Sequence, residues 1–338
     1  MPRLLLVSDS LSGGLGAAVR LEAEAAAAAG WETALASPEA NSVNVSQAAV
    51  THAHVPIPAR STVFGIAAAA RMLRRYLRDY KPDVVHCHGL RSFAVTLLAG
   101  RRALITYHGG SMGDSTVLSR GRLRTVALRL IPRVAVAAIS VTPGLPLGWT
   151  FAAHASPRLR SLGRLPASDE PLFAWVGRLD APKLPLVFIR ALAALPPELG
   201  VRAVVAGDGP LTREVVAEAR RLEVDVTFLG AVEDIEGVLS TARAVVLMSE
   251  SEGLPFSLQE AMWVGRPVVA PPFPGIRWLA GDTALYASSE DELASALEVL
   301  ATTDLHRELG ARAADRVRRL VRADDPARLL LELFSSQR

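Results

Sequence analysis

Short apolar runs alternate with helical patterns along the whole chain. The N-terminal half has four such runs, at residues 3–7, 83–87, 103–107 and 134–139. Continuous apolar runs of this length predict strands that are buried on both faces, as in a parallel sheet. Helical spacing fills most of the intervals, up to residue 29 and over 63–80, 92–99 and 118–131.

The same alternation restarts after a segment rich in proline, serine and acid, Leu165–Pro171. It predicts helices alternating with strands at 172–176, 201–206, 226–229, 244–248 and 267–270. This order is typical of α/β domains with parallel, doubly wound sheets. We therefore predict two such domains, over residues 1–164 and 165–322, each large enough for its own core. Because ligands bind beyond the carboxyl ends of parallel strands, we expect the functional site in a cleft between the domains.

The composition excludes several classes of protein. The 338 residues are 50% hydrophobic and carry a formal net charge of +3, and the basic residues do not cluster with aromatic ones, so we expect no nucleic-acid binding. Cys87 is the only cysteine, which rules out an intrachain disulfide. The chain shows no signal-peptide pattern and no apolar run of about 18 residues. We therefore expect a cytoplasmic protein.

The segment Ser249–Ala270 carries two acids in a context that suits ligand binding. Glu252 lies in a Gly-Pro loop after a predicted strand, and Glu260 lies in the first turns of the next helix. Such a loop presents a carboxylate beside the N–H groups of a helix N-terminus, and a carboxylate accepts hydrogen bonds from the vicinal diols of a ribose or hexose. Two other interpretations stay open: Ser257 and Glu260 form a capping box, and Glu252 is a solvated loop acid.

A second loop offers two cations at the end of a strand. Gly177 lets the chain turn, and Arg178 and Lys183 follow it. Two cations in this position can hold a diphosphate and neutralise charge on a departing nucleotide, although a single arginine there is more often a solvated surface residue. Lys183 favours a functional interpretation, because the only lysines among 37 basic residues are Lys81 and Lys183.

Two loops of the N-terminal half are further candidates. Gly13 and Gly14 lie in a turn that lets backbone N–H groups approach a phosphate. The dinucleotide-binding fingerprint fails there, because Val19 stands at its third glycine position. His108 follows a predicted strand and is placed to contact a reacting group, although a lone loop histidine is more often structural or solvated.

The sequence does not indicate a metal. His86 and His88 share one face of a predicted strand, with Cys87 on the other. No further ligands stand at zinc spacing, so we predict no zinc site. The chain also lacks an Asp-x-Asp pair that would hold a nucleotide-bound cation.

Taken together, these loops resemble the family-4 retaining glycosyltransferases. The segments VGRLDAPK, VVAGDGPL, VTFLGAVED and SESEGLPFSLQEAMWVGRPVV, in this order over residues 172–270, look like that family's donor domain. SDSLSGGLGAAV, KPDVVHCHG and ITYHGG are similar to its acceptor domain. The resemblance implies the GT-B fold, with two facing Rossmann-like domains and a cleft between them. Residues 1–164 would form the acceptor side, residues 165–322 would bind the nucleotide-sugar, and a C-terminal helix over 323–338 would pack back toward the first domain.

The resemblance also implies roles for positions of the second domain. Arg178 and Lys183 would bind the donor diphosphate and stabilise the leaving group, and Glu260 would hold the ribose. Glu252 would hold the transferred sugar. Further contacts would come from Leu229 and Gly230 near the base, and from Gly253, Leu254, Pro255 and Phe256 near the sugar and phosphate.

In the first domain, the resemblance implies that His108 would contact the sugar near the reacting carbon. It also implies that Gly13 and Gly14 would contact the diphosphate. The protein would need no cofactor besides the donor substrate, a UDP- or GDP-sugar. No residue indicates a divalent cation, although some relatives use one.

The activity implied is transfer of a hexose-like sugar to a small-molecule or lipid-linked acceptor with retention of configuration. Two alternatives share the architecture: a nucleotide-sugar epimerase or hydrolase, and a non-catalytic sugar-nucleotide-binding subunit. One departure bears on them, because Pro274-Gly275-Ile276-Arg277 replaces the family's Gly-Gly-x-Pro-Glu segment. The replacement changes a loop that would contact the sugar, which fits an unusual donor sugar or acceptor, and Arg277 counts toward the non-catalytic alternative.

Two basic stretches raise the question of peripheral contact with the inner face of a membrane. Residues 71–78 form a basic amphipathic helix, and residues 121–133 are the second stretch. Both fit an anionic lipid surface, and both fit a solvated helix face with an apolar stripe toward the sheet, which we favour.

Overall fold

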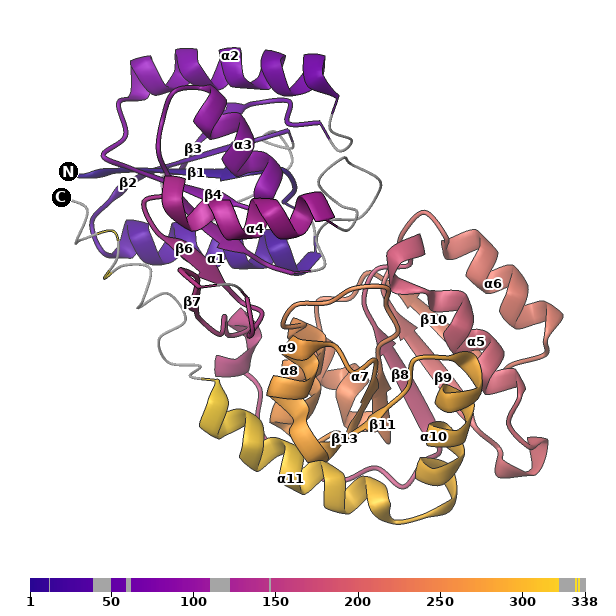
Figure 1. Cartoon of the computed structure of the whole chain (residues 1–338). Helices are drawn as coiled ribbons and strands as arrows, with labels where there is room; N and C mark the ends of the chain where they lie inside the picture. Colours follow the sequence, from indigo (N-terminus) through magenta and orange to yellow (C-terminus); the bar gives the residue numbers. More distant parts are fainter. Residues whose placement is uncertain are drawn as a thin grey trace. The chain divides into compact units, whose positions relative to one another are not determined.

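The computed structural model describes residues 1–11, 13–38, 50–58, 62–109, 122–145, 147–321, 332 and 334. The chain divides into two compact units, residues 1–157 with 325–338 and residues 158–324 (Figure 1). The predicted helix start at 118–121 and most of the predicted C-terminal helix lie outside the described residues. Each unit is built on one parallel sheet and is described by itself.

The N-terminal unit contains a seven-stranded parallel sheet in the order β3-β2-β1-β4-β5-β6-β7. Its strands are β1 (Arg3–Ser8), β2 (Glu32–Ser37), β3 (Val50–His54), β4 (Val84–His88), β5 (Leu104–Tyr107), β6 (Ala138–Ser140) and β7 (Thr150–Phe151). Its helices are α1 (Gly13–Ala28), α2 (Val63–Tyr80), α3 (Leu90–Leu98) and α4 (Arg122–Val134).

Helices cover both faces of this sheet. Leu5 and Val7 of β1 lie in a core shared with α2, α3 and α4, whereas Leu4 and Leu6 lie in a core shared with α1. Burial on both faces explains why β1 is a continuous apolar run in the sequence. Phe334 joins the second of these cores, with its ring centroid 5.7 Å from that of Trp31.

The predicted strand at 134–139 begins too early. Helix α4 continues through Pro132 to Val134, and the strand β6 begins at Ala138. The helix predicted over 118–131 therefore continues for three residues beyond its predicted end, although a proline inside a helix clashes with the carbonyl four residues before it. The chain instead places Pro132 in the last turn, where the helix is about to stop.

The C-terminal unit contains a six-stranded parallel sheet in the order β10-β9-β8-β11-β12-β13. Its strands are β8 (Leu172–Val176), β9 (Arg202–Ala206), β10 (Val226–Gly230), β11 (Ala244–Val246), β12 (Val268–Ala270) and β13 (Ala284–Tyr286). Its helices are α5 (Pro185–Ala193), α6 (Thr212–Arg221), α7 (Ile235–Thr241), α8 (Phe256–Val264), α9 (Pro274–Ala280), α10 (Glu290–Thr302) and α11 (Leu305–Leu320).

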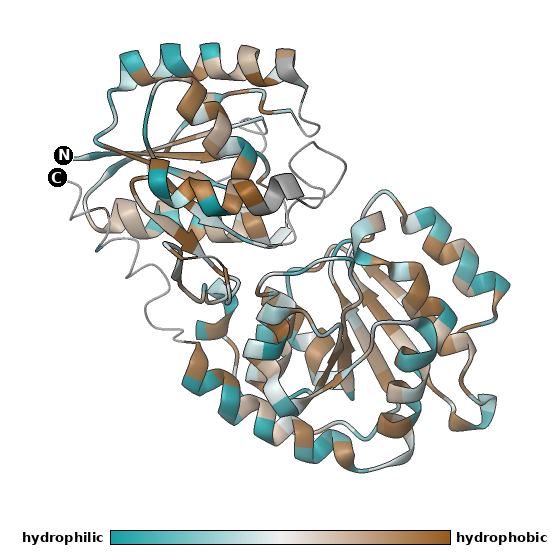
Figure 2. Ribbon diagram, viewed as in Figure 1, coloured by the Kyte–Doolittle hydropathy of each residue, from teal (hydrophilic) through white to brown (hydrophobic). Residues whose placement is uncertain are grey.

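Helices again lie on both sides of the sheet. Phe188 of α5, Val215 of α6 and Leu293 of α10 share one core with the strands, and Figure 1 shows α7, α8 and α9 on the opposite side. The strands are predominantly hydrophobic, whereas hydrophilic residues line the outer faces of α6 and α11 (Figure 2). None of the helices in the described residues is both long and apolar enough to span a membrane.

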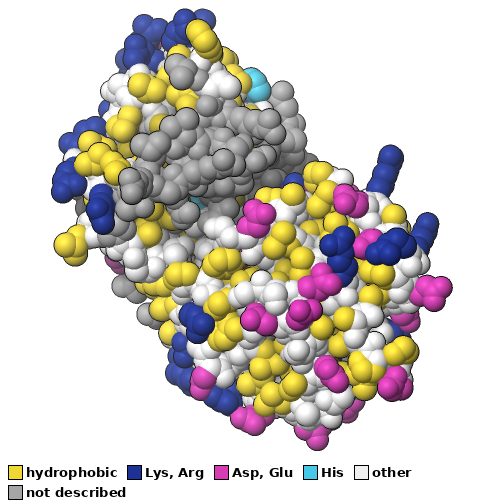
Figure 3. Space-filling model, turned by 45° about the vertical axis from the view of Figure 1, so that its right-hand side comes forward, with side chains coloured by type: hydrophobic (Ala, Val, Ile, Leu, Met, Phe, Trp, Pro, Cys, Tyr) yellow, Lys and Arg dark blue, Asp and Glu magenta, His cyan; other side chains and the backbone are white. Residues whose placement is uncertain are grey.

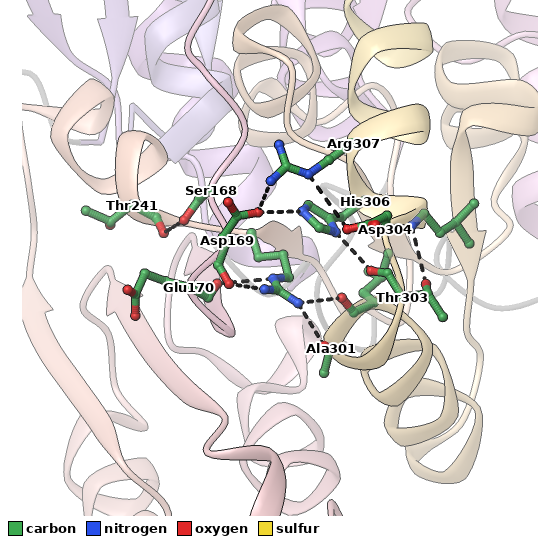
Figure 4. Close-up of polar contacts among 12 residues, drawn as sticks. Ser168, Asp169, Glu170, Thr241, Ala301, Thr303, Asp304, His306 and Arg307 are labelled. Atoms are coloured by element: carbon green, nitrogen blue, oxygen red, sulfur yellow. Dashed lines mark hydrogen bonds and ion pairs between the residues drawn. The ribbon is translucent and has the colours of Figure 1, made fainter.

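A buried arginine fastens the segment before β8 to the C-terminal unit. Arg243 donates to the carbonyl oxygens of Leu300 and Ala301, at 3.1 and 2.8 Å, and to that of Glu170 at 3.2 Å. The carboxylate of Asp169 lies between His306 and Arg307 at the start of α11 (Figure 4). Burying a guanidinium is costly unless its donors are paired, so these carbonyls account for an arginine in the interior.

Candidate functional site

Glycine contacts shape the carboxyl-end loops of the second sheet. A Cβ atom on Gly207 would lie 1.8 Å from the carbonyl oxygen of Gly177, and one on Gly275 would lie 1.8 Å from the carbonyl oxygen of Gly253. A side chain cannot occupy such a space, so the backbones meet at positions that require glycine. The loop after β8 is therefore packed on the loop after β9, and the start of α9 is packed on the loop that carries Glu252.

The structure brings Lys183 and Glu252 together. Lys183 ends a short 3₁₀ helix, Ala181–Lys183, and its Nζ atom donates to Glu252 Oε1. Two contacts to the carbonyl oxygen of Pro182 hold the loop in place, from Ser249 Oγ at 2.9 Å and from the backbone N–H of Glu250 at 2.8 Å. The Lys183 side chain keeps 29% exposure, so it can still contact a ligand. A cation and a carboxylate predicted on separate loops thus form one polar pair at the carboxyl end of the sheet.

Arg178 has a different partner in the described residues. Its Nε atom lies 2.9 Å from Asp180 Oδ2, and the side chain is 44% exposed. A hydrogen bond from Thr212, then one from the N–H of Gly209 and the charge of Arg178, hold the pKa of Asp208 below its ordinary value. The predicted diphosphate-binding pair therefore consists of one lysine bound to Glu252 and one arginine on the adjacent turn.

The capping-box interpretation of Glu260 is wrong. Helix α8 has Pro255 at its N-cap, with no side-chain cap, so Ser257 lies inside the helix. Glu260 is 3% exposed, and its Oε1 atom lies 3.7 Å from Arg158 Nη1. Glu260 is thus a buried carboxylate beside a half-exposed arginine, and it lies further into α8 than the third position of a capping box.

The backbone candidates of this unit lie at strand and helix ends. Leu229 and Gly230 end β10, and Gly230 accepts a hydrogen bond from the N–H of Gly207 at 2.7 Å. Gly253, Leu254 and Pro255 are buried in the loop before α8, and Phe256 begins that helix. The N–H groups of the first helical turn are a suitable binding site for phosphate oxygens.

In the N-terminal unit, Gly13 and Gly14 form the first residues of α1, and both are exposed. Gly13 has a φ of 59°. The helix starts close against the preceding loop, since a Cβ atom on Gly16 would lie 1.7 Å from the carbonyl oxygen of Leu11. The turn predicted to bind phosphate is therefore the N-terminus of a helix, and its two glycines are exposed.

His108 follows β5 and contacts a cluster of buried side chains. Its Nε2 atom lies 3.0 Å from His88 Nδ1, and the ring of His154 lies 5.5 Å away. Behind them, Glu22 Oε2 lies 3.3 Å from His88 Nε2, while Glu22 Oε1 contacts His86 Nδ1. Burial, followed by the charges of the neighbouring histidines, lowers the pKa of His108 well below its usual value.

Sequence reasoning missed Glu22, which lies inside the alanine-rich helix α1 yet is 2% exposed. An acid on the buried face of a helix needs a polar partner, and this is the feature that could have revealed it. Burial alone raises its pKa, but the charges and hydrogen bonds of His86 and His88 outweigh burial and hold the pKa below its usual range. One ligand atom from each of these three side chains lies within 4.8 Å of the others, a grouping that could hold a metal ion. The prediction of no zinc site rested on finding no further ligand near His86 and His88 in the sequence, and Glu22 is such a ligand from a distant helix.

The buried histidines predict a loss of stability in mild acid. Burial lowers the pKa of His154 from 6.5 to about 4. Between these values the unfolded chain binds the proton and the folded protein does not, so stability is lost as the pH falls through this window. The free energy of unfolding should fall by about 1.4 kcal/mol per pH unit for this group. Denaturant titrations at about pH 7, 6 and 5 would measure the slope. His154→Gln should reduce the slope, while burial of His86 and His108, which also lowers their pKa values, keeps part of it. Equal stability of the wild type at all three pH values would contradict the prediction.

Both halves of the chain match family descriptions. Residues 12–162 match "Glycosyltransferase Family 4", and residues 170–303 match "Glycosyl transferases group 1". The chain belongs to the family-4 glycosyltransferases. The resemblance inferred from the motifs is confirmed.

Curated relatives align with this chain over shorter stretches. The GalNAc-alpha-(1->4)-GalNAc-alpha-(1->3)-diNAcBac-PP-undecaprenol alpha-1,4-N-acetyl-D-galactosaminyltransferase of Campylobacter jejuni is 38% identical over 96 residues, 28% of this chain and 27% of that protein. The D-inositol 3-phosphate glycosyltransferase of Mycolicibacterium smegmatis is 33% identical over 139 residues, 38% of this chain and 31% of that protein. The alignments therefore span less than a third of the length of these relatives.

Solved structures extend the similarity to the whole chain. Anabaena Alr3699/HepE in complex with UDP and glucose matches with a TM-score of 0.76 at 18% identity, over 99% of this chain and 100% of that one. Sucrose-phosphate synthase from Thermosynechococcus elongatus matches with a TM-score of 0.77 at 20% identity, over 99% of each chain. These similarities confirm the predicted GT-B fold with two Rossmann-like sheets.

Proposed function

We propose that this family-4 glycosyltransferase moves a hexose-like sugar from a UDP- or GDP-sugar to a small-molecule or lipid-linked acceptor, with retention of configuration. The observation that carries the proposal is the contact between Lys183 and Glu252 at the carboxyl end of the second sheet. A lysine can neutralise the departing diphosphate, and a carboxylate beside it can accept hydrogen bonds from the sugar hydroxyls. One pair of side chains would thus contact both groups joined by the bond that breaks, the sugar and the diphosphate.

The neighbouring groups extend this assignment. Arg178 would share the diphosphate with Lys183, and the N–H groups at the start of α8 would bind the sugar phosphate. Glu260 would accept the ribose hydroxyls, and the end of β10 at Leu229 and Gly230 would bracket the base. In the other unit, His108 would contact the sugar, and Gly13 and Gly14 would offer N–H groups to the diphosphate.

The comparisons favour a uridine donor. Anabaena Alr3699/HepE is described in complexes with UDP, with UDP and glucose, and with UDP-glucose. The names of the relatives include both acceptor classes, an undecaprenol-linked glycan in Campylobacter jejuni and D-inositol 3-phosphate in Mycolicibacterium smegmatis. The HepE complexes support the donor type, and the names of the two relatives leave both acceptor classes within the proposal.

A panel of nucleotide-sugars tests the proposal directly. Calorimetry with UDP-, GDP-, ADP- and TDP-sugars should show binding of a UDP- or GDP-sugar, and a transfer assay should then require an acceptor. Turnover of the donor without any acceptor would favour the epimerase or hydrolase alternative. Donor binding with no turnover in the presence of lipid-linked and small-molecule acceptors would favour a non-catalytic subunit.

Glu260→Gln should weaken donor binding and preserve the fold. The neutral amide keeps the size of the side chain but loses the charged acceptor, and hydrogen bonds to charged groups contribute about 1.5–3 kcal/mol. The Kd for the nucleotide-sugar should rise by about tenfold or more. Calorimetry measures the change, and Glu214→Gln on the exposed face of α6 is the matched control. An unchanged Kd in Glu260→Gln would remove the ribose role.

For the basic helices we favour solvated faces within a cytoplasmic protein. Lysine and arginine side chains, drawn in dark blue, gather at the top of the view in Figure 3, where Figure 1 places α2. Arg74 of this helix donates to the carbonyl oxygens of Leu98 and Ala99, so part of the basic face is used within the fold. If the assignment is right, anionic vesicles should leave the rate of donor turnover unchanged, and the protein should not sediment with them. Binding to the vesicles that is lost when Arg71, Arg75 and Arg78 are substituted would contradict the assignment.

A further inference from the structure

Two polar atoms in the interior of the N-terminal unit face each other without a hydrogen bond. Glu22 Oε2 and His88 Nε2 are both buried, and within the described residues neither has a hydrogen-bond partner. Their side chains are 2% and 0% exposed, and the two atoms lie 3.3 Å apart. Buried polar groups almost always have a partner, so a facing pair without one indicates an ion or a water molecule bound between them.

The distance between the two atoms favours a metal ion over a water molecule. At a separation of 3.3 Å, a zinc ion bound about 2.0–2.1 Å from each atom would make an angle of about 104–111° with them, close to the tetrahedral value of about 109°. A water molecule at hydrogen-bond distances of about 2.8 Å would make an angle of only about 72°, which is too narrow for its two O–H groups to point at both atoms. The two atoms are therefore spaced as ligands of one zinc ion.

His86 completes a set of three ligands. Its ring lies on the same face of β4 as that of His88, with the ring centroids 4.5 Å apart, and its Nδ1 atom contacts Glu22 Oε1. One ligand atom from each of the three side chains lies within 4.8 Å of the others. Two histidines and one glutamate are a known set of zinc ligands, in which nitrogen and oxygen are the donor atoms.

The second nitrogen of each histidine is held by another side chain. His86 Nε2 lies 2.8 Å from Thr106 Oγ1, and His88 Nδ1 lies 3.0 Å from His108 Nε2. A histidine that binds a metal almost always uses its other ring nitrogen in a hydrogen bond, which fixes the orientation of the ring. Both rings thus have the outer partner that a metal ligand needs, and each keeps its remaining nitrogen toward Glu22.

We propose that Glu22, His86 and His88 bind one zinc ion in the interior of the N-terminal unit. The ion would join α1 to β4 and replace the contact between His86 and Glu22. The ring of Phe334, which belongs to an apolar core, lies 5.8 Å from that of His86, and all three ligands are buried. An ion enclosed in this way stabilises the fold and does not contact a substrate, so the inference is independent of the proposed sugar transfer.

The metal content of the full chain tests the proposal. The protein is produced in zinc-supplemented medium, purified without a metal-chelating resin and analysed by inductively coupled plasma mass spectrometry. We expect about one zinc per chain, and X-ray absorption should show nitrogen and oxygen neighbours at about 2.0–2.1 Å. Cys87 lies in the core on the opposite face of β4, so no sulfur should bind the ion. A chain that retains no zinc, or a sulfur atom bound to the ion, would overturn the inference.

Substitutions assign the ion to these side chains. Glu22→Gln and His88→Gln each remove one ligand, and the affinity for zinc should fall by more than the roughly 10–100-fold that loss of an outer partner causes. His306→Gln is the matched control, because it removes a buried histidine beside a carboxylate, Asp169, in the other unit. The control should keep its zinc, and equal zinc content in all three variants would place the ion elsewhere and contradict the proposal.

If the ligand variants do not fold, the wild-type protein still decides the question. The full chain is unfolded in guanidinium chloride with a chelator and then refolded with zinc or with the chelator. An ion that binds only the folded protein stabilises it, so zinc should raise Tm by about 5 °C or more. The same Tm in both samples would count against the site. These measurements use no nucleotide-sugar, so their outcome is separate from any failure of the proposed function.

Discussion

Replacing Lys183 with alanine should lower kcat/KM for sugar transfer by about a hundredfold or more, because removing one preorganised group that stabilises developing charge has effects of this size. The lysine is bound to Glu252 in the free protein. Its loss would remove the cation that we propose neutralises the leaving diphosphate, and it would also leave that carboxylate without its partner. Steady-state kinetics with the preferred donor would measure the change, and both kcat and donor affinity should fall.

Arg202→Ala is the matched control for Lys183→Ala. Arg202 begins β9, at the opposite end of the strand from the loops of the site, and pairs with Glu170 at the surface. Its removal takes the same charge from the same unit and should leave kcat/KM within about twofold, since exposed ion pairs contribute little. Equal kinetics for Lys183→Ala and the wild type would remove the diphosphate role.

Gly275→Ala should impair both the fold and donor binding. The added methyl carbon would lie 1.8 Å from the carbonyl oxygen of Gly253, which is backbone and cannot rotate away. Overpacking of this kind costs about 1–3 kcal/mol in the free energy of unfolding. Because Gly253 follows Glu252 directly, relief of the clash must also displace the loop that we propose holds the sugar. Denaturant titration and donor calorimetry on the same variant would measure the two losses.

Gly163→Ala provides the control for Gly275→Ala. A Cβ atom on Gly163 would have no neighbour within 4 Å, and its backbone is not in the left-handed region. Stability and donor Kd should both stay near the wild-type values. If Gly275→Ala behaved in the same way, the close approach of α9 to the Glu252 loop would not shape the site.

The sequence pattern predicted the elements whose apolar residues form a strong run or a regular helical spacing. The strand Leu172–Val176 and the helix Val63–Tyr80 have the bounds expected from their apolar spacing. The strands β2 and β3 were not predicted, because β2 is rich in alanine and β3 alternates with two histidines, so neither is a strong apolar run. Propensity is weak for such segments, and their structure depends on the pairing of β2 with β1 and of β3 with β2.

For the candidate site, the sequence predicted the loops that carry the polar residues. It predicted less well which of these side chains contact one another. It placed Lys183 and Glu252 on separate loops with related roles, and the structure puts them in contact. It missed Glu22, since 64 residues separate this acid from His86 along the chain. Contacts of that kind depend on helix α1 crossing the sheet beside β4, which no local pattern reveals.

The scarcity of lysine gives the Lys183–Glu252 pair a practical consequence. The chain has two side-chain amines, Lys81 and Lys183, and Lys81 lies exposed at the end of α2. An amine-selective acylating reagent followed by peptide mass spectrometry would therefore report on two positions with opposite expectations. Donor nucleotide-sugar should slow labelling at Lys183 and leave Lys81 as an internal reference, so occupancy of the site can be followed without any knowledge of the acceptor.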